Sequence, residues 1–107
     1  MGDRSQSRIY TELLNFLERS GISLKQAGSS EFGLAEQKAL EFLQLLASNN
    51  VRPLGIEVWR STAKGYTIDS LAGWASSTRE PNGAPREAVE AIAAAHLAPL
   101  DAVTIQF

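Results

Sequence analysis

Residues 53–74 of this 107-residue chain, PLGIEVWRSTAKGYTIDSLAGW, constrain the fold more than any other stretch. Apolar side chains alternate with other residue types in its first half, and the alternation resumes after Lys64-Gly65. A two-residue period is typical of a strand with one buried face, and a glycine between two such runs favours a tight turn. The stretch therefore predicts a β-hairpin with strands over about 54–60 and 65–70.

The outer side of this hairpin carries its most unusual residues. A register with Val58 opposite Ile68 on the buried face sets Glu57 opposite Asp69 on the outer face, and two opposed carboxylates repel each other. Such a pair persists if the register differs, if a nearby Lys or Arg neutralises it, or if a binding partner does so. Trp59 lies two residues after Glu57 and is therefore expected on the outer face too. An exposed Trp flanked by charge is typical of an interface hot spot. The predicted partner-binding patch consists of Glu57, Trp59 and Asp69, with Tyr66 and Arg60 as lesser contributors.

The rest of the chain predicts three helices and a last strand. Helical periodicity covers about 8–19, 35–48 and 85–97, and alternation returns at 101–107. The expected buried residues are Ile9, Leu13, Phe16 and Leu17, then Leu40, Phe42, Leu43, Leu46 and Ala47, then Val89, Ile92, Ala93 and His96. Gly21 is expected to cap the first helix in the left-handed conformation. The apolar connector after it should pack on the core, and 72–85 reads as a surface stretch rich in turn formers.

This order of helix, helix, strand, strand, helix, strand predicts a single α+β domain over residues 1–107. We expect a small, mainly antiparallel sheet of about three strands, packed against about three helices on one face. A right-handed crossover through the third helix would allow the last strand to pair parallel to a hairpin strand.

Composition narrows the function classes. A net charge of −2 argues against nucleic-acid binding through a basic surface, and the chain has no cysteine for a disulfide or thiolate site. No stretch matches a phosphate loop, a dinucleotide fingerprint or a zinc motif, so we expect no cofactor, no metal and no enzyme. The single histidine, His96, is expected to pack near a helix C-terminus, and Trp74 in the core. No apolar run is long enough for a membrane span, and the N-terminus is polar, so a cytoplasmic protein is expected.

Three segments together resemble the immunity protein 40 family of bacterial polymorphic-toxin systems. They are SLKQAGSSEFGLAEQKALEFLQLL, PLGIEVW and YTID, within residues 22–71. The corresponding positions are Leu24, Lys25, Gly28, Leu54, Gly55, Val58, Trp59, Tyr66 and Asp69. The chain departs from the family pattern where Ile56 replaces a Gly, Glu57 replaces an Asp, and Ser70-Leu71 replaces Asn-Trp.

The resemblance implies a small, non-catalytic domain that binds one cognate toxin domain and blocks it by stoichiometric inhibition. An acidic patch would suit a basic active-site cleft, such as that of a nuclease acting in the cytoplasm. Two alternatives remain open from the residues. One is a generic interaction or regulatory module, either monomeric or homodimeric through an exposed sheet edge. The other is a small hydrolase using paired carboxylates, for which so short a chain leaves little room for a deep cleft.

Overall fold

The computed structural model describes residues 2–76 and 83–107, and the side chains of 8–76 and 84–107. It confirms an α+β fold with the expected order of main elements. The elements are α1 (Gly2–Ser20), β1 (Ile22–Ser23), the 3₁₀ helix η1 (Lys25–Ala27), β2 (Phe32–Gly33), α2 (Glu36–Ser48), β3 (Gly55–Thr62), β4 (Gly65–Ala75), α3 (Gly83–Ala94) and β5 (Ala102–Gln106).

The main sheet has three strands in the order β4-β3-β5, and β3 pairs antiparallel with both neighbours. The predicted parallel pairing of the last strand is therefore wrong. The crossover through α3 does return the chain in the direction of β4, but β5 pairs on the far side of β3. β4 and β5 therefore run in the same direction, but they do not pair because β3 lies between them.

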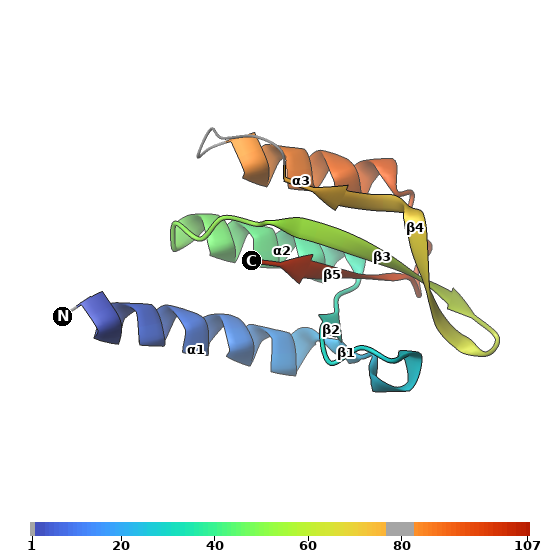
Figure 1. Ribbon diagram of the computed structural model, residues 1–107, viewed down its shortest axis with the longest axis horizontal. Helices are drawn as coiled ribbons and strands as arrows, with labels where there is room; N and C mark the ends of the chain where they lie inside the picture. Colours follow the sequence, from blue (N-terminus) through green and yellow to red (C-terminus); the bar gives the residue numbers. More distant parts are fainter. Residues whose placement is uncertain (1, 77–82) are drawn as a thin grey trace.

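The three helices pack on one face of this sheet, with α2 between α1 and α3 (Figure 1). The helix-facing side chains of β3 and β5 form a core with apolar residues of all three helices. Its fully buried members include Leu13, Phe42, Leu46, Ile92, Val58 and Val103. The apolar side chains that recur at every second position of the strands thus pack against an apolar stripe on each helix, in one core layer.

The helices bury the predicted stripes to different degrees. In α1 Leu13 is buried and its three predicted partners are half-buried, and in α2 only Ala47 of the predicted stripe is exposed. In α3 the buried positions include Ala84, Ala88 and Ile92, so the predicted stripe is wrong except at Ile92. An alanine-rich helix has few large side chains to set its orientation. His96 follows the helix, is exposed and has a φ of +48°, which contradicts its predicted packing.

The connector between α1 and α2 packs on the core, as predicted. Its strands β1 and β2 pair antiparallel, and Leu24 is buried beside them. Gly21 ends α1 without adopting the predicted left-handed conformation. A Cβ at this position would lie 2.3 Å from the Leu17 carbonyl oxygen and 2.7 Å from the Phe32 Cβ, so glycine is needed for close approach.

The β3–β4 register differs from the prediction by one residue. Trp59 lies opposite Ile68, and Val58 opposite Asp69. The loop holds two residues, Ala63-Lys64, between the paired Thr62 and Gly65, and this loop length sets every pair above it.

The strand β4 is also longer than predicted, because it continues through a bulge to Ala75. Ile56 lies opposite Trp74, so Glu57 alone faces the bulge formed by residues 70–73. Trp74 is half-buried and packs against the main core. The predicted turn stretch thus begins inside a strand, and its residues 77–82 lie outside the described ones.

Candidate protein-binding face

Trp59, Glu57 and Tyr66 lie on the outer face of the sheet, which is the side turned away from the three helices. The prediction that Trp59 is exposed is wrong, because 8% of its surface remains accessible. Leu24 from the connector and Ala102 from β5 pack against its ring. The connector therefore covers this end of the outer face and turns Trp59 into the centre of a second, small core.

A chain of hydrogen bonds runs from this core to the surface. The Trp59 indole N–H donates to Thr104 Oγ1 at 3.2 Å, and the Thr104 hydroxyl donates to Glu57 Oε1 at 3.4 Å. Gln106 Nε2 donates to the same Glu57 oxygen at 3.2 Å. Both donors belong to β5, the strand beside β3, and they fix the position of the half-buried Glu57 carboxylate.

A second carboxylate, that of Glu31, completes this surface. Gln106 Nε2 also donates to Glu31 Oε2 at 3.2 Å, so one amide group lies between the two acids. We call Glu31, Glu57 and Gln106 the acidic pair site. Glu31 and Gln106 were missed by sequence reasoning, because they come from the loop before β2 and from β5. No spacing along the chain indicates that these segments flank β3.

Asp69 and Arg60 lie on the helix-facing side, away from the acidic pair site. The predicted opposition of Glu57 and Asp69 is therefore wrong. Instead, Arg60 Nε donates to Asp69 Oδ2 at 3.0 Å and Arg60 Nη1 to Asp101 Oδ2 at 3.1 Å. Arg60 Nη2 donates to the Ala95 carbonyl oxygen at 2.8 Å, just after α3. The contacts of Arg60 are thus internal, and this guanidinium joins β3, β4 and the turn between α3 and β5.

The hydrogen bonds around Arg60 shift the pKa values of its partners. The Arg60 guanidinium, followed by the backbone N–H of Leu71, lowers the pKa of Asp69. Burial alone would raise the pKa of Asp101, but donation from the Ser61 and Ala98 N–H groups and from Arg60 outweighs it, so that pKa is lowered. Asp101 and then Asp69 raise the pKa of Arg60. All three groups therefore stay charged at neutral pH.

Tyr66 lies at the margin of the outer face. It is half-buried against the small core, and its hydroxyl donates to the Leu100 carbonyl oxygen at 2.9 Å. This bond attaches the β4 end of the hairpin to the turn before β5. The predicted five-residue patch therefore divides into Glu57 and Tyr66 at the surface, a buried Trp59, and an internal Arg60–Asp69 ion pair.

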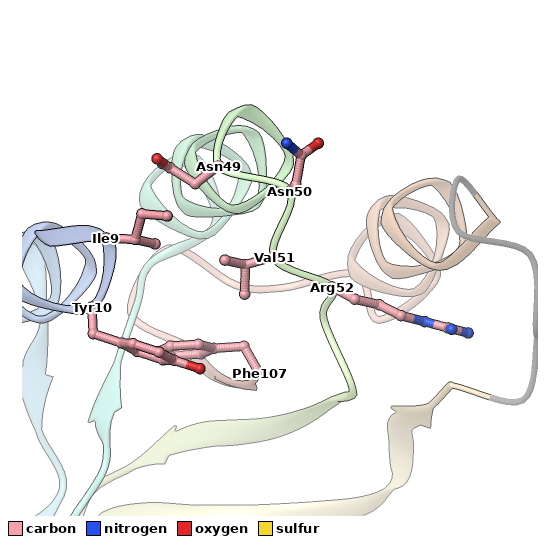
Figure 2. A pocket seen from close by; sticks show the side chains of 7 residues that line it. All are labelled: Ile9, Tyr10, Asn49, Asn50, Val51, Arg52 and Phe107. Carbon is pink, nitrogen blue, oxygen red and sulfur yellow. The ribbon is translucent and has the colours of Figure 1, made fainter. Parts of the chain in front are cut away.

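A separate hollow of about 450 Å³ lies between α1, the end of α2 and the chain end (Figure 2). The rings of Tyr10 and Phe107 stack there at 6.5 Å between centroids. The Arg52 side chain extends away from these rings in Figure 2, and its Nη2 donates to Ser76 Oγ at 3.2 Å. The hollow thus offers aromatic and amide surface, but no charged group directed at a ligand.

The described residues contain no group of three or more His, Cys, Asp or Glu side chains arranged to hold a metal ion. No helix within them is long and apolar enough to cross a membrane. No protein-family model matches the chain, and a search of curated proteins finds no match to it. The acidic pair site thus holds two carboxylates on the outer face through a single amide group.

Proposed function

We propose that this protein is an immunity protein that binds a cognate toxin domain and blocks it by stoichiometric inhibition. The observation that carries the proposal is the acidic pair site, where Gln106 holds Glu31 and Glu57 side by side on the outer face. The resemblance of residues 22–71 to the immunity protein 40 family supports the same function. The toxin would act in the cytoplasm, with a nuclease as the leading candidate.

The chemistry of the acidic pair site favours a cationic partner surface. Each carboxylate accepts from Gln106 and keeps other lone pairs for a Lys or Arg of the toxin. Active-site clefts that bind nucleic acids are themselves positively charged, so acids on the inhibitor would speed encounter and occupy the cleft. The site suits this role because it presents its charge toward solvent.

The support beneath Glu57 gives the site a fixed geometry. Thr104 and Gln106 both donate to its carboxylate, and Trp59 holds Thr104 from the small core. A side chain that is already ordered loses less conformational entropy on binding. In this proposal Trp59 positions the site rather than contacting the toxin, and Asp69 and Arg60 hold the hairpin on the helices.

The proposal predicts that a toxin domain is encoded beside this protein, and the test is growth rescue when the two are co-expressed. The double variant Glu31→Lys/Glu57→Lys should lose rescue and bind the purified toxin at least tenfold more weakly, because it places cations against a basic cleft. The matched control is Glu12→Lys/Glu18→Lys, which makes the same charge change at two exposed positions of α1. The control should still rescue, and circular dichroism should show both proteins folded.

Two results would count against the proposal in different ways. Full rescue by the folded Glu31→Lys/Glu57→Lys variant would move the binding site elsewhere on the molecule. Failure of the unaltered protein to bind or neutralise the adjacent toxin would overturn the function itself.

A further inference from the structure

The strand β4 forms an open edge of the main sheet. Sheet order places β3 on one side of β4 and no described strand on the other. Leu34 and Val103 exchange backbone hydrogen bonds at 2.8 and 2.9 Å, so the backbone groups of Val103 point to Leu34, just after β2, and those of Ala102 and Thr104 point to β3. Backbone direction alternates along an antiparallel strand, so Trp59 and Glu57 bond to β5 while Val58 and Arg60 bond to β4.

The same alternation identifies the free groups of β4. Thr67 and Asp69 lie opposite Arg60 and Val58, so their N–H and C=O groups point to β3. By this alternation those of Tyr66 and Ile68 point outward, and the described backbone hydrogen bonds of turns, loops and caps do not involve them. The edge thus carries unpaired donors and acceptors in the spacing that another strand requires.

The regular part of this edge lacks the Lys and Pro residues that often protect sheet edges. The segment Gly65–Asp69 contains no Lys and no Pro, and its only charged side chain, Asp69, is neutralised by Arg60. Ile68 is 43% exposed on the outer face, and its side chain is large and apolar. The regular part of the edge ends where the bulge of residues 70–73 begins.

We propose that a second copy of this chain pairs with this edge, antiparallel, through Gly65–Asp69 and about a two-fold axis at Thr67. Tyr66 of each copy then lies opposite Ile68 of the other, and the two Thr67 residues face each other. Gly65 of each copy lies opposite Asp69 of the other. The segment is its own complement, and this is the reason to assign a second copy rather than a foreign strand.

The Tyr66–Ile68 and Thr67–Thr67 pairs of this register belong to favourable classes. Aromatic residues opposite β-branched ones, and Thr opposite Thr, stabilise antiparallel strands. No like charges are opposed, and Lys64 of one copy lies next to Asp69 of the other. The bulge of each copy passes beyond the hairpin loop of its partner, so it does not obstruct the pairing. The contact is short, so the dimer should be weak and form in the micromolar to millimolar range.

The first test measures mass by sedimentation equilibrium over a range of concentrations. The protein should pass from 11.6 kDa toward twice that mass as its concentration rises. Ile68→Lys should raise the dissociation constant at least tenfold, because a charge on the edge opposes strand addition. The control Ser61→Lys places the same charge on the outer face of β3, away from the edge, and should leave the dissociation constant unchanged. A monomer at every concentration would overturn the proposal.

Single cysteines test the register, because the natural sequence contains none. Thr67→Cys should form a disulfide-linked dimer on mild oxidation, since facing residues of a non-hydrogen-bonded pair lie about 4.5 Å apart between Cα atoms. Ser70→Cys on the same strand should link at least tenfold more slowly, because its two copies would lie about 20 Å apart. Faster linking by Ser70→Cys or Ile68→Cys than by Thr67→Cys would overturn the Thr67 axis. This proposal does not depend on the proposed function, since no toxin is needed.

Discussion

At the scale of single residues, Trp59 combines two roles that are usually separate. Its ring fills the small core beneath the connector, and its N–H fixes Thr104, which in turn holds Glu57. An aromatic side chain with one polar atom suits this place, because the ring is buried and the N–H still finds an acceptor. Packing and the orientation of a surface carboxylate thus depend on the same residue.

Substitutions of Trp59 should separate these two roles. Trp59→Phe keeps an aromatic ring but removes the donor to Thr104, and should lower the free energy of unfolding by about 1 kcal/mol. Trp59→Ala also removes the packing and should cost about 3–5 kcal/mol. Urea unfolding followed by circular dichroism measures both. Equal stability of the Ala and wild-type proteins would show that Trp59 is not a core residue.

The alternation of side chains between the two faces of a strand explains why the candidate site was only partly predictable. The sequence places Glu57 and Trp59 correctly on the outer face, because β3 alternates regularly. It cannot show that the connector covers Trp59, since that depends on where a distant segment packs. Asp69 was assigned to the wrong face because its parity depends on the loop, and the one-residue register shift moves it beside Arg60.

At the scale of elements, the close approach of Gly21 to Leu17 and Phe32 determines how α1 joins β1. Gly21 N donates to the Leu17 carbonyl oxygen at 2.7 Å, and Phe32 of β2 lies directly against Gly21. The glycine therefore permits contact between the helix end and the connector. The three helices and the hairpin were predictable from periodicity and turn residues, but α1 begins at Gly2 rather than near residue 8, α3 ends at Ala94 rather than near 97, and β1 and β2 were not predicted. The four-residue bulge in β4 was not predictable either, because Ser70–Gly73 carries no pattern that distinguishes it from a turn.

A methyl group at position 21 should force these elements apart. Gly21→Ala would place a carbon against the Leu17 oxygen and the Phe32 Cβ, and should destabilise the protein by about 1–3 kcal/mol. Thermal unfolding measures the change. The comparison is Gly28→Ala, where a Cβ meets no atom within 4 Å but the φ of +90° is unfavourable for alanine. A Gly21→Ala protein as stable as wild type would show that the helix end shifts freely.

At the scale of the whole molecule, Arg60 fastens parts that are distant in the sequence. Its guanidinium contacts Asp69 of β4, Asp101 before β5 and the carbonyl oxygen of Ala95 after α3. The hairpin extends beyond the helical layer, and these bonds attach it to the end of α3. The order of elements was predictable, but this attachment was not, because it joins three segments that the chain separates by many residues.

This attachment makes stability depend on acid pH. The pKa values of Asp69 and Asp101 are lower in the folded protein than their ordinary value of 3.8, so the unfolded chain binds protons more readily. Their contribution is complete above the ordinary value and is lost as the pH falls through the folded values. The free energy of unfolding, measured with urea, should therefore fall steeply below about pH 4.

The variant Asp69→Asn/Asp101→Asn tests whether these two groups cause that fall. Neither side chain can then titrate, so the variant should be less stable than wild type at neutral pH and lose less stability on acidification. Glu12→Gln/Glu18→Gln, which removes two exposed carboxylates from α1, should keep the steep wild-type fall. If instead the Asn variant and wild type lose stability in parallel, the acid sensitivity belongs to other carboxylates. The ion pairs of Arg60 would then hold the hairpin without coupling it to protonation.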